Sequence, residues 1–391
     1  MKQWALEVEQ ELTEHILPYW SRLQDTVHGG YYGAVDVSLH VHQDASKGGI
    51  AACRILWTFS AAYRVLGEAG YQEHADHAYH FLRDHVLDPH YGGLYWMVDA
   101  AGRPLDTRKH IYAQAFGVYA LSEYYRATGT EEALRLACSL FELIEDKGYD
   151  AHLAAYKEEF NEAWLEQPNV LLSEHGLLAD ITMNTHIHVL EAYTNLYAAS
   201  QEERVKQAIV RLLDQLHERI YDHRTGFLGV FFDKAWQPLL DLRSFGHDIE
   251  ASWLIDRAMK TIGAEKPEHV QMVIDIAYNI ADHALQADSS LMNEQRGSHI
   301  DTTRIWWVQA EAMVGFYNAY ERTKDPRFLT ILEGLWSYTK RHLIDAREGG
   351  EWFWAVGDLG QPTKQGISGP WKCPYHNGRF CLEIMERVAQ S

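Results

Sequence analysis

Apolar residues recur along most of the chain with the 3.6-residue period of an α-helix, and they predict helices of two kinds. The segments 111–125 and 187–197 are apolar on almost every side, which is typical of a helix enclosed by protein. The segment 71–87 is apolar mainly on one face, as expected of a helix that covers a core. In all, the pattern predicts helices near residues 3–20, 48–67, 71–87, 108–127, 131–146, 181–199, 203–219, 247–262, 267–286, 301–322, 327–343 and 375–388.

Short glycine-rich segments lie between pairs of these helices and predict β-hairpins closed by turns. They occupy residues 88–104, 222–238 and 345–362, and residues 29–33 form a partial copy. The recurrence indicates a repeated helix–hairpin–helix unit, and no Pro/Ser-rich linker interrupts it. We therefore expect one all-α domain over residues 1–391, an (α/α)6 barrel with its hairpins over one mouth. An open helical solenoid is the alternative.

Composition narrows the classes of partner. The chain has 391 residues, of which 47% are apolar, so it can bury a large core. A formal charge of −20 argues against nucleic acid or an anionic membrane as a partner, because both bind clustered Lys and Arg, and it leaves a neutral ligand as the better candidate.

The N-terminal residues and the lack of a long apolar segment predict a cytoplasmic protein, and the cysteine spacing predicts free thiols. The N-terminal residues turn acidic where a signal peptide needs an apolar run, and no segment approaches the ~18 apolar residues of a membrane span. The four cysteines show no CxxC spacing, so we expect neither a disulfide framework nor a cysteine-rich zinc site.

Two histidines far apart in the chain have unusual polar and aromatic neighbours. His247 lies in Ser-Phe-Gly-His-Asp-Ile-Glu at 244–250, and His376 lies in the segment 369–379. On a helix, Glu250 would stand at i+3 from His247, where its carboxylate could orient the imidazole or raise its pKa. A helix-terminal histidine followed by a capping glutamate explains the same spacing.

A second histidine pair, His186 and His188, lies in a segment that is predicted to be helical. Residues two apart on a helix diverge by about 200°, so only one of these imidazoles can reach a common site. Asn184 and His188 share a helix face at i and i+4. With 22 histidines in the chain, a core or surface role for either one remains the simpler explanation.

Arg54 and three tryptophans complete the candidates. Arg54 follows Ala-Ala-Cys, a context too apolar for a guanidinium unless it meets a partner or lines a cavity. A buried structural ion pair would account for it equally well. Trp306, Trp307 and Trp371 could provide flat faces for sugar rings, although most of the 13 tryptophans must pack in the core.

Several familiar motifs are missing from the sequence. It contains no GxxxxGK[ST] loop, no GxGxxG and no HExxH, which argues against the common nucleotide sites and the zinc-protease site. Its many carboxylates could include a glycosidase pair, but their separation cannot be read from the sequence.

Taken together, these segments resemble the N-acylglucosamine 2-epimerase superfamily, and within it the cellobiose 2-epimerases. The resemblance runs over essentially the whole chain. The segments that carry it are Arg-Ile-Leu-Trp at 54–57, Tyr-Gly-Gly-Leu-Tyr-Trp at 91–96, Gly-His-Asp-Ile-Glu-Ala at 246–251, Trp-Trp-Val-Gln-Ala-Glu at 306–311 and Gly-Pro-Trp-Lys-Cys-Pro-Tyr-His-Asn-Gly-Arg at 369–379.

The resemblance implies an (α/α)6 barrel that inverts C2 of the reducing-end sugar of a β-1,4-linked disaccharide, without a metal or a redox cofactor. It assigns the catalytic pair to His247 and His376, and contacts with O1 and O2 of the opened sugar to Arg54 and His188. Polar binding positions fall on Tyr112, Asn184, Glu250 and Glu294, and stacking positions fall on Trp371 and Trp307, with Trp306 as the alternative to Trp307. His186 is expected to point away from the site.

The chemistry of C2 inversion agrees with these side chains. A proton leaves C2 of the opened sugar and another returns to the opposite face, so one base that cannot cross the plane is insufficient. Two imidazoles, with ordinary pKa values near ~6.5, can each act as acid or base near neutrality. A mannose-type aldose–ketose isomerase of the same superfamily is the alternative function, and an (α/α)6 glycoside hydrolase is a more distant one. We expect a monomer or weak homo-oligomer.

Overall fold

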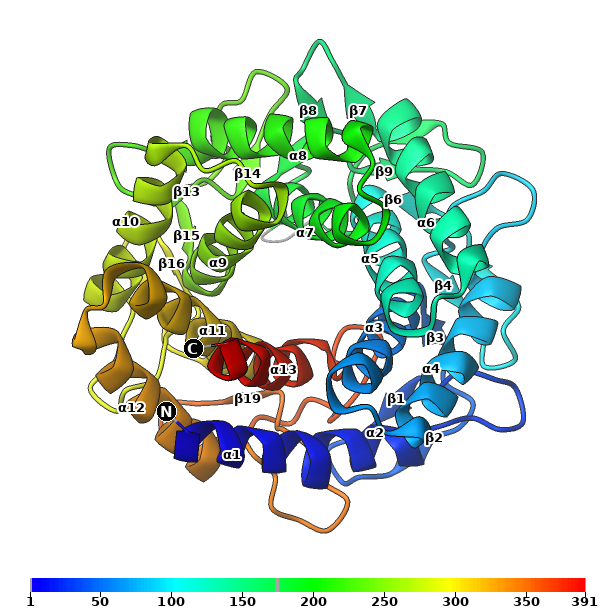
Figure 1. The fold of residues 1–391 in the computed structure, drawn as a ribbon, viewed down its shortest axis with the longest axis horizontal. Helices are drawn as coiled ribbons and strands as arrows, with labels where there is room; N and C mark the ends of the chain where they lie inside the picture. The colour runs from blue at the N-terminus through cyan, green and yellow to red at the C-terminus, as the bar shows by residue number, and fades with distance from the viewer. Residues whose placement is uncertain (1, 173–175, 391) are drawn as a thin grey trace.

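The computed structural model describes residues 2–172 and 176–390 and arranges their helices in two concentric rings (Figure 1). Contacts of α13 with both α3 and α11 close the inner ring, so the chain forms the expected (α/α)6 barrel and not an open solenoid. The inner ring consists of α3 (Gly49–Leu66), α5 (Ile111–Thr128), α7 (Met183–Ser200), α9 (Phe245–Ile262), α11 (Trp306–Thr323) and α13 (Tyr375–Gln390). The outer ring consists of α1 (Lys2–Gln10) with α2 (Leu17–Arg22), α4 (Ala69–Phe81), α6 (Glu131–Leu143), α8 (Glu203–Gln215), α10 (Pro267–His283) and α12 (Pro326–His342).

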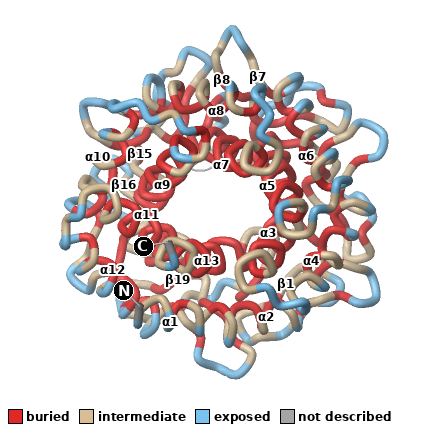
Figure 2. The backbone as a smooth tube through the Cα atoms, viewed as in Figure 1, coloured by how far each residue is buried: buried red, intermediate tan, exposed pale blue. Residues whose placement is uncertain are grey.

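The two kinds of helix differ in burial, as their sequences predict. The inner ring is buried almost throughout, whereas the outer helices expose one side to solvent (Figure 2). From Ile111 to Tyr124, every residue of α5 is buried. Four short π-helical segments extend the outer helices at residues 11–16, 82–86, 144–148 and 216–220.

A tight turn built on an aspartate recurs after the outer helices. In the first copies, the Oδ1 atoms of Asp25 and Asp88 accept backbone N–H groups two and three residues later. The fourth residue after each aspartate, Gly29 or Gly92, has positive φ, a conformation that glycine adopts without strain. Similar turns join paired residues at 149–156, 221–228, 285–291 and 344–352. The repeat is thus more regular than its four glycine-rich copies indicate.

The strands are short and belong to these loops. The segment 88–104, expected as one hairpin, contains two successive turns, at Asp88–Gly93 and Asp99–Gly102. The helix expected near 301–322 begins only at Trp306, because β17 and β18 pair with β16 and β19. The strands are β1 (Ala34–Val35), β2 (Val41–His42), β3 (Lys47–Gly48), β4 (Met97–Val98), β5 (Pro104–Asp106), β6 (Lys109–His110), β7 (Tyr149–Asp150), β8 (Ala155–Tyr156), β9 (Glu159–Phe160), β10 (Glu166–Gln167), β11 (Ile181–Thr182), β12 (Tyr221–Asp222), β13 (Phe227–Leu228), β14 (Phe231–Phe232), β15 (Leu242–Ser244), β16 (Glu294–Arg296), β17 (His299–Asp301), β18 (Arg304–Ile305) and β19 (Ala355–Val356).

The two ends of the barrel are built differently. Short turns lead from inner to outer helices, and Gly67 and Gly129 end α3 and α5 in the left-handed conformation. The long loops that contain the hairpins lead instead into the N-terminal ends of the inner helices. Side chains from the first turns of six helices therefore meet under one set of loops.

The cysteines and the helix lengths agree with the sequence. Cys53, Cys138, Cys373 and Cys381 are free thiols. Within residues 2–172 and 176–390, no helix combines the length and the apolar character that crossing a membrane requires.

Candidate active site

A cavity of ≈ 390 Å³ lies at the N-terminal ends of the inner helices. This volume is in the range typical of small-molecule sites. Its lining contains almost all the residues singled out from the sequence, namely Arg54, Tyr112, Asn184, His188, His247, Glu250, Trp306, Trp307, Trp371 and His376. Leu171, Leu172, Ile305 and Trp354 complete the wall.

His376, in the first turn of α13, is backed by a carboxylate. Its Nδ1 lies 2.7 Å from Oε1 of Glu311 on α11, and both side chains are buried. Burial raises the pKa of Glu311, and Arg379 lowers it. When Glu311 is ionised it accepts the hydrogen bond from Nδ1–H, which leaves Nε2 as the basic nitrogen of His376. Burial and the nearby cations Arg54 and Arg379 hold the pKa of His376 well below its ordinary value.

His247, in the first turn of α9, is backed by a hydroxyl. Its Nδ1 lies 2.7 Å from Oγ of Ser244, the last residue of β15. Burial and the proximity of His188 lower the pKa of His247 to about 3. Glu250 does not take the orienting role that the i+3 spacing allows, because its Oε1 accepts a hydrogen bond from Arg379 Nη2 at 2.5 Å.

The Trp307 ring packs against the imidazoles of both His247 and His376. Its ring centroid lies 4.7 Å from that of His247 and 5.5 Å from that of His376. The neighbouring Trp306 lies 6.2 Å from His376 and packs on Trp354 at 4.7 Å. Both tryptophans therefore belong to the wall around the imidazoles, and Trp307 contacts both of them.

The two histidines of α7 separate as helical geometry requires. Asn184 and His188 line the cavity, and His188 Nδ1 lies 2.9 Å from Oε2 of Glu191. His186 is buried away from the cavity lining. Its Nδ1 lies 2.8 Å from the Thr182 carbonyl oxygen, and its Nε2 accepts the Tyr156 N–H.

Arg54 is held by aromatic rings, and it forms no ion pair with a carboxylate of residues 2–172 and 176–390. Its guanidinium lies 4.3 Å from the Phe116 ring centroid and 4.7 Å from that of Tyr375. Nη2 donates to the Tyr112 hydroxyl at 2.8 Å, and Nη1 donates to the Trp371 carbonyl at 3.3 Å. Its charge is therefore available to an anionic oxygen in the cavity.

Two buried carboxylates and an imidazole come close enough to hold a metal ion. Ligand atoms of Glu250, Glu311 and His376 all lie within 4.8 Å of one another. Arg379 Nη2 already donates to both carboxylates, at 2.5 and 2.7 Å. The guanidinium thus supplies the positive charge that a metal ion would bring, and an ion would have to displace it.

One predicted site residue, Glu294, is not among the residues that line the cavity. Glu294 belongs to β16, where it pairs with Ser244 of β15. Sequence reasoning assigned no role to Glu191 or Glu311, which back His188 and His376. The i+3 spacing could have found Glu191, but no local signal links Glu311 to His376, which lies 65 residues further along the chain.

The arrangement favours chemistry in which negative charge develops on the bound molecule. The cavity holds two neutral imidazoles, a third imidazole in His188 and the guanidinium of Arg54. The N-terminal ends of the inner helices, with their partial positive charge, surround it. Such a site can remove a proton from carbon and stabilise the resulting oxyanion.

Comparison with known proteins gives consistent relatives. The sequence pattern of the family described as N-acylglucosamine 2-epimerase (GlcNAc 2-epimerase) matches residues 30–378. The chain is similar to the cellobiose 2-epimerase of Ruminococcus albus, with 47% identity over 384 residues that cover 97% of this chain and 98% of the relative. It is also similar to that of Dictyoglomus turgidum, with 43% identity and 98% of each chain covered.

Solved structures agree with the sequence relatives. The cellobiose 2-epimerase of Bacillus thermoamylovorans superimposes with a TM-score of 0.98 at 58% identity, covering 99% of this chain and 100% of that one. A D-mannose isomerase has a TM-score of 0.86 at 20% identity, covering 99% and 98%, and it shares the fold.

Proposed function

The chain belongs to the N-acylglucosamine 2-epimerase family and is an isomerase, and we propose that it reversibly inverts C2 of the reducing-end sugar of a β-1,4-linked disaccharide. Cellobiose, lactose and mannobiose are the candidate substrates. The observation that carries the proposal is the pair of imidazoles, His247 and His376, on different helices of one cavity. The names of the cellobiose 2-epimerases to which the chain is similar support the disaccharide as substrate.

In the proposed reaction the two imidazoles exchange roles. One of them first assists opening of the sugar ring, which exposes an aldehyde at C1. One neutral imidazole then accepts the proton from C2, and the electron pair of the C–H bond delocalises to give a cis-enediolate. The other imidazole takes up a proton from solvent water beside the enediolate anion and donates it to C2 from the opposite face, and the first imidazole returns its proton to solvent. The low pKa of His247 and His376 supports a base role, because both are neutral near pH 7.

Arg54 and His188 stabilise the enediolate in this scheme. A proton leaves C2 more easily when the charge that develops on O1 and O2 meets fixed donors in a site shielded from water. The free charge of Arg54 and the burial of His188 beside Glu191 support these roles. No metal ion or redox cofactor is needed in the proposal, because these side chains supply both proton transfer and charge stabilisation.

The remaining cavity residues hold the sugar rings. Trp371 and Trp307 offer flat faces to the C–H groups of the substrate, with Trp306 as the alternative to Trp307. Tyr112, Asn184 and Glu250 provide polar contacts, and Glu294 contributes from the loop beside Ser244. A neutral disaccharide suits this mixture of tryptophans and few polar groups. We propose that the protein acts in the cytoplasm as a monomer or weak homo-oligomer.

Incubation with cellobiose, followed by separation of the products, tests this function. Glucosyl-mannose is the expected product. Glucosyl-fructose as the main product, with conversion of free mannose, would indicate the aldose–ketose isomerase instead, which shares the enediolate but returns the proton to C1. Free glucose would indicate a glycoside hydrolase.

A further inference from the structure

Behind the cavity, one arginine joins the three inner helices that face α13. Arg379 is fully buried, and its Nη1 donates to Glu191 of α7. Its Nη2 donates to Glu250 of α9 at 2.5 Å and to Glu311 of α11 at 2.7 Å. Three carboxylates from three helices therefore share one guanidinium.

Two of these carboxylates hold imidazoles of the candidate site. Oε2 of Glu191 lies 2.9 Å from Nδ1 of His188, and Oε1 of Glu311 lies 2.7 Å from Nδ1 of His376. A single carboxylate therefore links each of these two imidazoles to Arg379. His247 is not connected in this way, because its Nδ1 pairs with Ser244.

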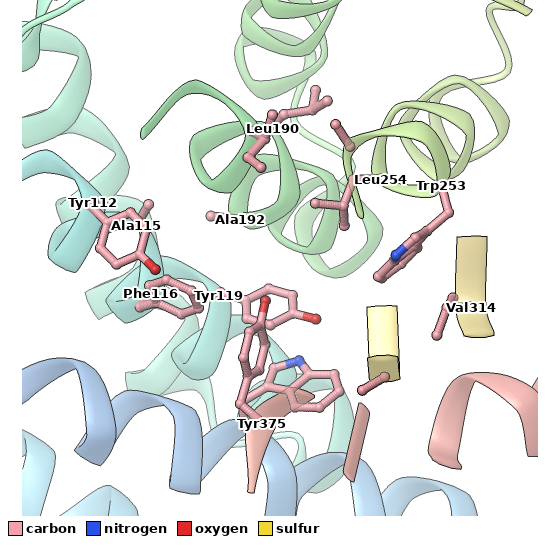
Figure 3. Close-up of a cluster of buried hydrophobic side chains, with 14 of the residues drawn as sticks. Tyr112, Ala115, Phe116, Tyr119, Leu190, Ala192, Trp253, Leu254, Val314 and Tyr375 are labelled. Atoms are coloured by element: carbon pink, nitrogen blue, oxygen red, sulfur yellow. The ribbon is translucent and has the colours of Figure 1, made fainter. Parts of the chain in front are cut away.

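Aromatic rings fix the guanidinium in place. Its carbon lies 4.7 Å from the Trp253 ring centroid and 4.1 Å from that of Tyr375. In Figure 3 the rings of Tyr375 and Trp253 project into the space between the inner helices. The Tyr375 hydroxyl donates to Glu191, so the ring that stacks on Arg379 also holds one of its carboxylates.

The network formed by Arg379 with Glu191, Glu250 and Glu311 lies between two cavities. Glu250 lines the candidate site, and Glu191 lines a second cavity. This second cavity, of ≈ 280 Å³, is lined by the C-terminal halves of the inner helices and by Glu191 and Trp253. It approaches the network from the end of the barrel opposite the candidate site. Trp253 Nε1 also donates to Oε2 of Glu311 at 3.0 Å, and the Tyr375 hydroxyl donates to Glu191, but Arg379 is the donor that the three carboxylates share.

We propose that Arg379 is a positioning residue that fixes the orientation and the basicity of His188 and His376 together, through Glu191 and Glu311. Its consequence for catalysis rests on the proposed epimerase function. Burial raises the pKa of Glu250 and Glu311, and Arg379 lowers the pKa of both and of Glu191. Where the ionised carboxylates outnumber the one guanidinium they carry an excess of negative charge, and negative charge beside an imidazole favours the imidazolium. Arg379 offsets that excess and keeps both imidazoles neutral.

The direction of the effect follows from the groups around His376. Burial lowers the pKa of His376, and Arg54 and Arg379 lower it further. Burial also lowers the pKa of His188, Glu191 raises it, and Arg54 and Arg379 lower it. Without Arg379, the pKa values of His188 and His376 should rise. The titratable and charged groups that face His376 are Arg54 of α3, Tyr112 of α5, His188 and Glu191 of α7, His247 and Glu250 of α9, Glu311 of α11 and Arg379 of α13.

The first test compares Arg379→Gln and Arg379→Lys with a control, Arg387→Gln. Arg387 lies two turns further along α13 and pairs with Glu383 and Glu321, where it lines the second cavity and not the candidate site. In Arg379→Gln we expect kcat for cellobiose to fall about 100-fold at pH 7, and to recover as the pH rises and His376 loses its extra proton. Arg379→Lys keeps the charge but not the fork of donors, so kcat should fall by a similar factor at every pH.

Histidine NMR without substrate gives a readout that is independent of the reaction. In Arg379→Gln the His188 and His376 signals should take the imidazolium form at a higher pH than in the wild type, while the His247 signal stays unchanged. If these signals and the pH profile match those of the wild type, and stability alone falls as in Arg387→Gln, Arg379 is merely structural. If the wild type does not epimerise cellobiose, the proposed function fails, yet the NMR titration still decides the role of Arg379.

A second variant covers failure of Arg379→Gln to fold. Glu191→Gln removes a carboxylate that binds His188 and Arg379 but not His376. If Arg379 couples the two imidazoles, the downfield Nδ1–H resonance of His376 should move in this variant as well. An unmoved resonance would show that the two imidazoles are held independently, which contradicts the proposal.

Discussion

The surroundings of His376 and His247 differ although both imidazoles line one cavity and contact Trp307. Nδ1 of His376 meets the carboxylate of Glu311, which Arg379 also binds. Nδ1 of His247 meets the hydroxyl of Ser244. A carboxylate fixes the tautomer and stabilises the imidazolium, whereas a hydroxyl can donate or accept and carries no charge. The two histidines are therefore unequal as bases, and each can be probed through its own partner.

Removal of either imidazole should have the largest effect. We expect His376→Ala and His247→Ala each to lower the rate of epimerisation by about 10³-fold or more, because general acid–base catalysis by one group contributes roughly 10²–10⁴-fold and inversion needs both. The rate of glucosyl-mannose formation from cellobiose measures this. The matched control is His186→Gln, a buried histidine outside the cavity lining. A single alanine variant with half the wild-type rate would refute the two-base scheme.

The partners of the two imidazoles should differ in their effects. Glu311→Gln keeps the shape of the side chain but removes the charge, at a cost of about 1.5–3 kcal/mol, or roughly 10- to 100-fold in kcat. Ser244→Ala removes a neutral hydrogen bond worth about 0.5–1.5 kcal/mol, so its loss should be roughly tenfold or less. Steady-state kinetics with thermal melts as the folding control will rank them. Equal losses in the two variants would show that the charge behind His376 has no special role.

Trp371 tests whether the His376 loop also binds the sugar. Trp371 lies five residues before His376, and its ring contacts Trp96 and Tyr112. Trp371→Ala should lower kcat/KM for cellobiose without moving the pH profile, because the lost stacking costs about 1–3 kcal/mol of transition-state stabilisation. Trp354→Ala is a useful comparison, because Trp354 lines the same cavity but packs on Trp306. An unchanged kcat/KM in folded Trp371→Ala would exclude a stacking role.

Treatment with a chelator should leave the activity unchanged, which is the smallest of the expected effects. Arg379 already donates to Glu250 and Glu311 beside His376, so we expect full activity after exhaustive exposure to a chelator and without added nucleotide or nicotinamide. Loss of activity that zinc or another divalent ion restores would show that the Glu250, Glu311 and His376 group binds a metal.

Local pattern in the sequence predicted the barrel and singled out several residues of its cavity, and the resemblance to the N-acylglucosamine 2-epimerase superfamily supplied others such as Tyr112. The all-round apolar segments 111–125 and 187–197 are inner helices, and helical spacing separates His188 from His186. The boundary at Trp306 was missed because the strands before it pair with partners distant in sequence. The same i+3 rule is right for His188 and Glu191 but wrong for His247 and Glu250, since the spacing makes a pair possible and a competing partner decides it.

The links between helices could not be predicted in this way. Glu311 reaches His376, and Arg379 reaches Glu191, Glu250 and Glu311, only because the ring closes. Nothing in the sequence near any one of them specifies the other partners. The residues that line the cavity were therefore accessible from the sequence, but the network that sets their protonation was not.

Epimerisation in D2O tests the central claim, that His247 and His376 act on opposite faces of one enediolate, most directly. The wild type should place solvent deuterium at C2 of the product. A variant that retains only the imidazole that removes the C2 proton of the substrate should still exchange that proton with solvent, without inverting the centre. NMR of the recovered sugar distinguishes exchange from inversion. Full inversion by either single variant, or wild-type product that retains its original C2 hydrogen, would contradict the account.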